Sequence, residues 1–177
     1  LYDSYIDRKW IVCNEEKMNT DLTKVYNRKC NNILKQKFIQ DNMFAGLATL
    51  FSKEELSFLS DDQIQINAES YLEEISKDGD MTGLIVKASN EKAQFVHRPT
   101  AEYFSAKWFF EHFQENKQFL IKFIFNDVYK VVRRFLDCFL AKDTPLQMSI
   151  LNGNLMEIIK LDKRNEIENS VNKTDLA

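Results

Sequence analysis

The chain has 177 residues, of which 44% are hydrophobic, and its formal net charge is −3 at neutral pH. A chain of this length buries roughly 70% of its unfolded surface on folding, which is enough for one domain with a sizeable core. The acidic balance argues against a nucleic-acid partner, because proteins that bind nucleic acids usually carry an excess of positive charge.

The three cysteines, Cys13, Cys30 and Cys138, lie far apart and form no CxxC pair. Since His97 and His112 are the only histidines, we expect neither a zinc site nor any other metal site. Cysteines without an evident pairing pattern favour a reducing compartment, and we therefore predict a cytoplasmic location.

No stretch of the sequence predicts a membrane segment. The longest apolar run, FLIKFIF, is interrupted by Lys122 and is too short to cross a bilayer. The first residues show no signal-peptide pattern. Because the chain begins with Leu1 rather than Met, we expect it to be part of a longer protein.

The first half of the chain predicts helices. Residues 3–17 form an amphipathic pattern, and residues 21–40 predict a second helix that continues as an apolar helix over 42–51. Gly46 interrupts that apolar stretch and costs about 1 kcal/mol against alanine in a helix. The side chains that we expect to point inward from the second helix are Leu22, Val25, Tyr26, Ile33, Leu34 and Phe38.

Two local signals mark the next helix boundaries. Ser52, followed three residues later by Glu55, is the pattern of a capping box, in which each side chain satisfies a backbone N–H at a helix start. A further helix is predicted from Asp61 or Asp62, with Ile64, Ala68, Tyr71, Leu72 and Ile75 on its apolar face. It ends at Gly79, which suits a left-handed residue at a helix C-terminus.

The segment that follows predicts the only hairpin. Two apolar runs, Leu84–Val86 and Phe95–Val96, flank a polar stretch and favour two short antiparallel strands. Pro99 then opens a helix, because proline is favoured at the first helical position, where its missing N–H is no loss. Further helices are predicted over 117–125 and 127–141.

Three helices, a hairpin and another helix are the order of a winged helix. We therefore predict a mainly α fold, with a winged-helix-like regulatory domain over 1–116 and a helical connector over 117–142. Residues 143–177 carry a T-P-L start at Thr144 and an Asn152-Gly153 turn, which predict a first ankyrin repeat. Gln147 stands where that repeat usually has histidine. Since one repeat cannot bury its own faces, we expect an incomplete array that continues in the longer protein.

The sequence also resembles a known protein family. The stretch FVHRPTAEYFSAKW, Phe95–Trp108, is similar to the F-[VI]-H-[RKL]-x-[FT]-x-E-[YF]-[FL]-x-A signature found downstream of NACHT-type ATPase modules. LYDSYIDRKWIVCNEEK, LATLFSKEEL and the ankyrin start resemble large NACHT–ankyrin proteins, so the resemblance covers essentially the whole chain. Pro99 and Thr100 depart from it, because the family more often has Thr or Ser, and Phe, at these positions.

The resemblance implies a signalling ATPase that switches between an ADP-bound closed state and an ATP-bound open state, often as a homo-oligomer. The sequence holds no G-x-x-x-x-G-K-[ST] loop, so this chain is expected to be non-catalytic and to hold no cofactor alone. The resemblance places ADP or ATP on a NACHT module upstream in the same protein. It also implies protein partners for the ankyrin repeats.

His97 is the candidate site residue. The resemblance implies that a histidine at this position reaches the ADP phosphates, and an imidazole can donate a hydrogen bond to a phosphate oxygen. The alternative is a structural histidine packed at a helix start. Arg98 either supports the same anion contact or forms a salt bridge, and Glu102 is expected to be structural, in the first turn of its helix.

Two further clusters have a functional and a structural interpretation. A run of aromatic side chains could form a binding surface, but aromatics at helical spacing predict core: Phe104, Trp108, Phe109, Phe110 and Phe113. Lys130, Arg133 and Arg134 form a small basic patch, which is too short for a typical nucleic-acid face.

The sequence thus predicts a regulatory and protein-interaction segment that couples the nucleotide state of an upstream ATPase to a partner-binding ankyrin array. One alternative is a stand-alone winged-helix module that binds nucleic acid, which would need a wider basic face. Another is an enzyme with an unrecognised site, but no spacing of acidic or nucleophilic residues predicts one.

Overall fold

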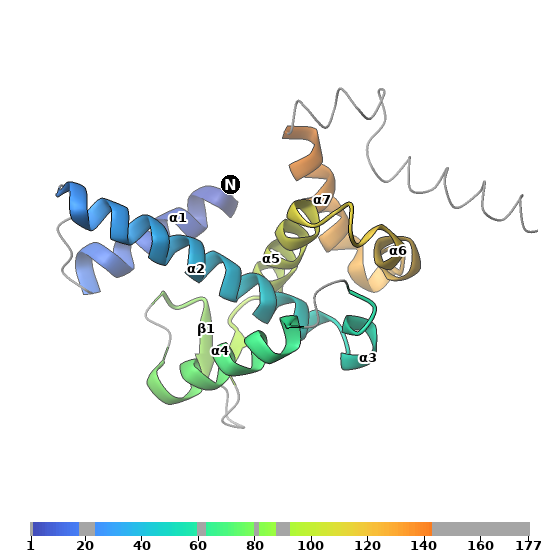
Figure 1. Ribbon diagram of the computed structural model, residues 1–177, viewed down its shortest axis with the longest axis horizontal. Helices are drawn as coiled ribbons and strands as arrows, with labels where there is room; N and C mark the ends of the chain where they lie inside the picture. Colours follow the sequence, from blue (N-terminus) through green and yellow to red (C-terminus); the bar gives the residue numbers. More distant parts are fainter. Residues whose placement is uncertain (1, 18–23, 60–62, 80–81, 88–92, 143–177) are drawn as a thin grey trace, which may run out of the picture. The chain divides into compact units, whose positions relative to one another are not determined.

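The chain is mainly helical, as predicted, and the computed structural model describes residues 2–17, 24–59, 63–79, 82–87 and 93–142 (Figure 1). It divides into two compact units, Leu1–Trp108 and Phe109–Ala177, and the division falls within one helix. The domain boundaries at 116 and 142 stay predictions, and the ankyrin repeat predicted over 143–177 lies outside the described residues. In the described part, no helix combines the length and apolarity that crossing a bilayer requires.

Helix α1 (Tyr2–Val12) continues as one turn of π-helix, Cys13–Lys17, which confirms the predicted first helix. Its buried side chains Ile6, Trp10 and Cys13 share one face. Trp10 packs on Phe38 with ring centroids 4.9 Å apart. Because Phe38 belongs to the next helix, Val25–Leu50, the apolar face of α1 rests on that helix. The Asn14 side chain donates to the Trp10 carbonyl, one turn earlier in the same helical run, at 2.9 Å.

Helix α2 (Val25–Leu50) joins the two predicted helical segments into one. In its second half residues 42–47 are all buried, and the core includes Met43, Phe44, Ala45 and Leu47. Gly46 lies here against the backbone of another helix. A Cβ at Gly46 would lie 2.8 Å from the Ala101 carbonyl oxygen, which is closer than real Cβ atoms come. The glycine therefore permits two helix backbones to approach closely.

The first half of α2 corrects one prediction. Phe38 is buried as expected, but Ile33 and Leu34 are 67% and 49% exposed. The prediction from periodicity assumed that other helices cover α2 along its whole length. The first turns of α2 contact only α1, and only on one side. Leu22 and the side chains of Val25 and Tyr26 lie outside the described part.

The capping box is confirmed at the short helix α3 (Lys53–Leu56). Ser52 N–H donates to Glu55 Oε2 at 2.8 Å, and Glu55 N–H donates to Ser52 Oγ at 3.2 Å. Helix α4 (Ile64–Asp78) then ends at Gly79, whose φ of +81° confirms the predicted left-handed residue. The two proposed start residues of this helix, Asp61 and Asp62, lie outside the described residues.

Helix α4 packs across α2 through apolar and polar contacts. The Asn42 amide donates to the Tyr71 hydroxyl at 3.0 Å. One turn from Tyr71, Glu74 faces Asp41 of α2. Burial raises the pKa of the Asp41 carboxyl above its usual range, Lys37 opposes this effect, and the charge of Glu74 adds to it.

The predicted hairpin is confirmed by strands β1 (Ile85–Lys87) and β2 (Ala93–Phe95), which pair antiparallel with Ile85 opposite Phe95. Ile85 and Phe95 face the core, while Val86 and Gln94 are exposed. Both strands contact α4, and Ala93 N–H donates to Ser76 Oγ at 3.1 Å. The hairpin is thus held against a helix by its inner face.

Helix α5 (Arg98–Glu111) follows the hairpin as predicted, but it begins at Arg98, so Pro99 is its second residue rather than its first. In the second unit, helix α6 (Lys117–Phe119) runs into one turn of π-helix, Leu120–Ile124. A short 3₁₀ turn, Asp127–Tyr129, leads into helix α7 (Lys130–Lys142). The core of α7 is one stripe at a spacing of four residues: Val132, Leu136 and Leu140. Both predicted late helices are confirmed.

Candidate functional site

His97 lies between the end of β2 and the first residue of α5. On one side, Val96 N–H donates to the Leu84 carbonyl at 2.9 Å, which extends the hairpin pairing up to the histidine. On the other side, the His97 carbonyl accepts the Thr100 N–H at 3.0 Å, within the first turn of the helix. The backbone is therefore fixed on both sides of His97.

The side chain of His97 is exposed, together with those of Val96 and Arg98. Phe95 is buried, its ring lies 6.2 Å from the Phe104 ring, and strand alternation turns Val96 outward. His97 lies two residues beyond the end of β2, where the alternation no longer applies. The His97 side chain is not buried in this chain, whereas a histidine packed at a helix start would be. An exposed imidazole on a fixed backbone can donate a hydrogen bond to an anion that another surface presents.

Arg98 is paired with Glu102, one turn further along α5. Arg98 Nε lies 3.1 Å from Glu102 Oε1, and the two side chains are 60% and 6% exposed. The salt-bridge interpretation of Arg98 is thereby confirmed. Glu102 is the fifth residue of the helix and lies outside its first turn. The expectation that the helix dipole favours a carboxylate at this position is therefore wrong. Its carboxylate is buried and depends on the Arg98 guanidinium for compensation.

Replacing Arg98 with alanine is expected to lower the free energy of unfolding by about 1–2 kcal/mol, because it leaves the Glu102 carboxylate without its cation. The loss stays below that for a fully buried pair, since Arg98 is largely exposed. Urea unfolding measures it. Adding Glu102→Gln to Arg98→Ala is expected to recover part of the loss.

Lys77→Ala serves as the matched control for this pair. Lys77 and Glu73 form an ion pair at the same helical spacing, but both side chains are 68% exposed. Exposed pairs contribute little to stability, so no measurable loss is expected. Equal losses for Arg98→Ala and Lys77→Ala would contradict the importance of the buried Glu102 carboxylate.

The aromatic run belongs mostly to the core, as predicted: Phe104, Trp108, Phe109 and Phe113 are buried, and Phe110 is half-buried. Phe104 and Trp108 are 0% and 1% exposed in the first unit. In the second unit, Phe109 stacks on Phe119 with ring centroids 5.3 Å apart, and Phe110 lies 5.7 Å from Phe139. These side chains are therefore packed against other parts of their own unit, and the structure does not present them as a binding surface.

The small basic patch of α7 is partly engaged in holding its own unit together. Arg133 Nη1 donates to the carbonyls of Ile124 and Asn126 at 2.9 and 3.0 Å. Its Nη2 lies 3.6 Å from Asp127. The guanidinium thus satisfies carbonyls at the end of the π-helix, and Lys130 and Arg134 remain as the exposed cations of the patch.

The two candidate side chains at this junction differ in their surroundings. The His97 imidazole is exposed, whereas the Arg98 guanidinium is paired with Glu102. The described residues contain no group of three or more His, Cys, Asp or Glu side chains arranged to hold a metal ion.

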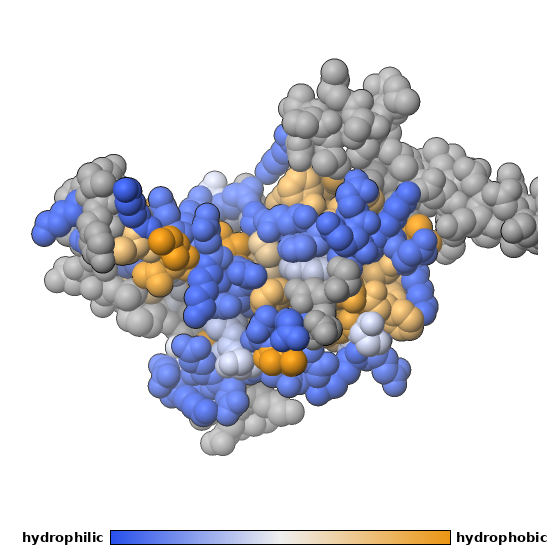
Figure 2. All heavy atoms as spheres, viewed as in Figure 1, coloured by the Kyte–Doolittle hydropathy of each residue, from blue (hydrophilic) through white to orange (hydrophobic). Residues whose placement is uncertain are grey.

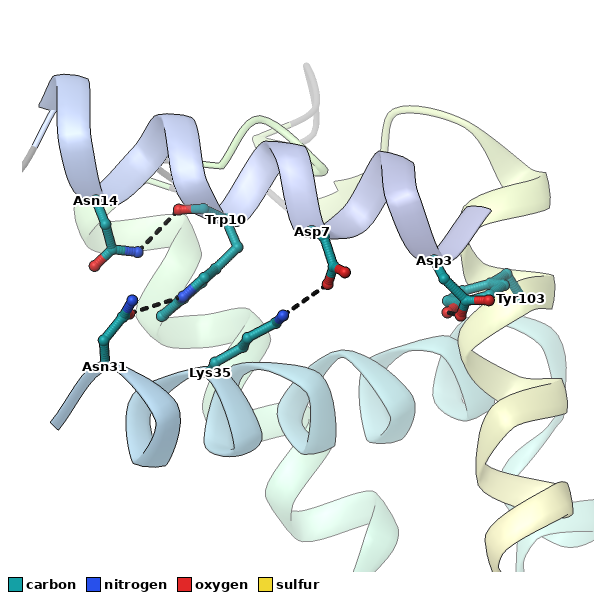
Figure 3. Close-up of polar contacts among 7 residues, drawn as sticks. All are labelled: Asp3, Asp7, Trp10, Asn14, Asn31, Lys35 and Tyr103. Atoms are coloured by element: carbon teal, nitrogen blue, oxygen red, sulfur yellow. Dashed lines mark hydrogen bonds and ion pairs between the residues drawn. The ribbon is translucent and has the colours of Figure 1, made fainter. Parts of the chain in front are cut away.

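One polar contact was missed by the sequence analysis. The Tyr103 hydroxyl donates a short hydrogen bond to the Asp3 carboxylate (Figure 3). The Tyr2 ring also stacks on the Tyr103 ring, with centroids 5.4 Å apart. The sequence analysis assigned no contact to Tyr103. Because its partners lie about 100 positions away in the sequence, no local pattern could have revealed this contact.

Comparisons with protein-family models, with curated proteins and with solved structures find no match to this chain. The similarity to NACHT–ankyrin proteins therefore rests on the sequence motifs alone.

Proposed function

We propose that this chain is a non-catalytic regulatory segment of a NACHT–ankyrin signalling protein. In this proposal, residues 1–116 form a winged-helix-like domain with the hairpin as its wing. Residues 117–142 form a connector, and residues 143–177 begin an ankyrin array that binds protein partners. The segment couples the nucleotide state of an upstream ATPase to that array.

The observation that carries the proposal is the placement of His97. Its imidazole is exposed, while hydrogen bonds of the hairpin and of α5 fix the backbone on either side. A rigid, exposed donor can contact a phosphate held by another module, and it loses that contact when the module moves away. Such a difference in contacts between two states is what couples a nucleotide to a conformation.

The proposal requires an ATPase module upstream of this chain, and sequencing can test for one. The reading frame upstream of Leu1 must encode a phosphate-binding loop of the form G-x-x-x-x-G-K-[ST], because this chain contains none. A longer protein without such a loop would contradict the proposal.

In the longer protein, His97→Ala is expected to weaken ADP binding about tenfold, which corresponds to about 1.4 kcal/mol. The physical reason is the loss of a hydrogen bond to a charged phosphate oxygen. Isothermal titration calorimetry of the purified protein measures the change. The 177-residue chain alone is expected to show no ADP binding.

Gln94→Ala is the matched control, since Gln94 is exposed on the outer face of the same hairpin. It is expected to leave ADP affinity unchanged. If His97→Ala also leaves ADP affinity unchanged, His97 does not sense nucleotide and the chain is only a connector. The alternative nucleic-acid module is less supported, because Arg133 is engaged with backbone carbonyls.

A further inference from the structure

The last turn of α4 ends in an Asp-Gly dipeptide. Asp78 is the final residue of the helix, and Gly79 follows it with a φ of +81°. A left-handed backbone at this position favours glycine, because any other residue would be strained there. The conformation that ends α4 therefore places an Asp-Gly bond at its C-terminus.

An Asp-Gly bond can rearrange without an enzyme. The glycine nitrogen attacks the aspartate carbon Cγ, and the new N–Cγ bond closes a five-membered succinimide ring. The carboxyl hydroxyl and the amide proton leave as water. A second water molecule then opens the ring, either at Cγ, which restores aspartate, or at the main-chain carbonyl carbon, which yields isoaspartate. Glycine favours ring closure because it has no Cβ to hinder the approach.

The surroundings of the Asp78–Gly79 bond are open. Both residues are exposed. Among the described residues, no atom outside the immediate chain neighbours lies within 4 Å of a Cβ built on Gly79. Figure 2 shows a hydrophilic surface over the last turns of α4, at the lower left of the view. Solvent therefore reaches both reacting groups, and no described side chain obstructs the ring.

Helix α4 itself restrains the reaction. The Gly79 N–H donates to the Ile75 carbonyl at 2.8 Å, so a helical hydrogen bond holds the attacking nitrogen. A helical ψ of about −42° also keeps this nitrogen turned away from the Asp78 side chain. Ring closure therefore requires the last turn to open, which helix ends do more readily than core segments. Ile75 opposes this opening, because its side chain is buried.

The same turn of α4 holds the hairpin. Ser76 Oγ donates to the Leu72 carbonyl at 2.8 Å and accepts the Ala93 N–H of β2 at 3.1 Å. Strand β1 also lies beside α4 (Figure 1). Isoaspartate at Asp78 would lengthen the main chain by one carbon, two residues after Ser76, and so displace the helical hydrogen bonds of this turn. A change at Asp78 thus reaches the hairpin through Ser76.

We propose that Asp78 is a modification site, at which the chain converts spontaneously to isoaspartate and thereby loosens the hairpin. The opening of the last turn of α4 sets the rate of this conversion. Water is the only co-reactant, since the molecule that leaves on ring closure is replaced by the one that opens the ring.

Peptide mapping by mass spectrometry, after incubation of the whole chain at neutral pH, measures the conversion and assigns it to a position. Isoaspartate is expected at Asp78. Its formation is expected to be at least tenfold slower than in a free peptide of residues 76–82, which is too short to form a stable helix. Asp78→Glu is expected to abolish the reaction at this position, because the longer side chain would have to close a six-membered ring.

Two isoleucines of α4 test whether the last turn sets the rate. Ile75→Ala removes the buried side chain that holds this turn and is expected to speed the conversion at least fivefold. Ile66→Ala is the matched control, since Ile66 is 60% exposed, and is expected to leave the rate within twofold. If circular dichroism shows that Ile75→Ala does not fold, Ile75→Val replaces it, with an expected increase of at least twofold.

Hydrogen exchange of the isomerised chain, separated from the parent by chromatography, measures the loosening of the hairpin. The Ala93 amide is expected to exchange at least tenfold faster in the isomerised chain, because its acceptor Ser76 is displaced. The Leu136 amide of α7, in the second unit, is the control and is expected to exchange equally in both forms.

Three results would overturn the proposal. The first is a folded chain without isoaspartate at Asp78 while the free peptide converts. The second is an equal rate in the folded chain and in the peptide, or in the Ile75 and Ile66 variants, which would show that α4 does not set the rate. The third is an Ala93 amide that exchanges equally in the parent and the isomerised chain.

Discussion

Gly46→Ala is expected to destabilise the protein by about 2 kcal/mol, although alanine favours helices over glycine by about 1 kcal/mol. The added Cβ would lie 2.8 Å from the Ala101 carbonyl oxygen, 3.1 Å from Ser105 Oγ and 3.3 Å from Phe104 Cβ. The closest of these atoms belongs to the backbone of α5, so the clash is relieved only when one helix moves. Chemical denaturation of the two proteins measures the loss.

Ala48→Gly separates the two effects in that substitution. It makes the reverse change two residues away in the same helix, at a partly exposed position, and is expected to cost about 1 kcal/mol from helix propensity. The two substitutions change helix propensity in opposite directions. If both destabilise the protein, packing against α5 rather than helix propensity determines the effect of Gly46→Ala. A Gly46→Ala protein as stable as the parent would contradict the close approach of α2 and α5.

Phe104→Ala is expected to cost about 3–5 kcal/mol, the usual range for removing a fully buried aromatic ring. Phe104 is 0% exposed, and its ring lies 5.3 Å from that of Tyr103 and 6.2 Å from that of Phe95. The cavity would open where the hairpin meets α5. Since domains are commonly stable by about 5–15 kcal/mol, much of the stability would be lost.

Phe104→Leu keeps the measurement possible if the alanine protein does not fold, because it removes less volume and is expected to cost less. Phe58→Ala is the control, since Phe58 is 56% exposed and its truncation is expected to change stability by less than about 0.5 kcal/mol. Thermal unfolding followed by circular dichroism compares the three variants. A larger loss for Phe58→Ala than for Phe104→Leu would contradict the assignment of the aromatic run to the core.

The features that the sequence predicted correctly depend on neighbouring residues. The Ser52 and Glu55 capping box, the left-handed Gly79 and the β1–β2 hairpin each follow from a few adjacent positions. Such local preferences act wherever the segment is placed in the fold. They could therefore be recognised before the packing of the helices was known.

The wrong predictions concern how helices cover one another. Ile33 and Leu34 have the spacing of a buried stripe, but α1 contacts the other side of α2 at Asn31 and Lys35. Which side of α2 is covered depends on where α1 packs, and no local pattern of α2 carries that information. Gly46 was interpreted by helix propensity alone, because its neighbour Ala101 is distant in sequence.

At the candidate site, too, some features depend on adjacent residues and others on how the helices pack. The junction of hairpin and helix at His97 could be predicted from Phe95, Val96 and Pro99. The exposure of its imidazole could not, because strand alternation would place His97 on the same face as the buried Phe95, whereas the strand ends at Phe95. The burial of Glu102 could not be predicted, because it depends on which elements cover that side of α5. The role of His97 toward a nucleotide stays a prediction.

The contact between Tyr103 and Asp3 has a consequence for the order of events during synthesis. A ribosome adds about 5–20 residues per second, so the 100 residues that separate the two partners take about 5–20 s to emerge. Helix α2 emerges much sooner, so Trp10 and Asp7 can already form their contacts with Asn31 and Lys35. Helix α1 is therefore expected to dock in two stages on the nascent chain, first along α2 and, several seconds later, at its beginning on α5.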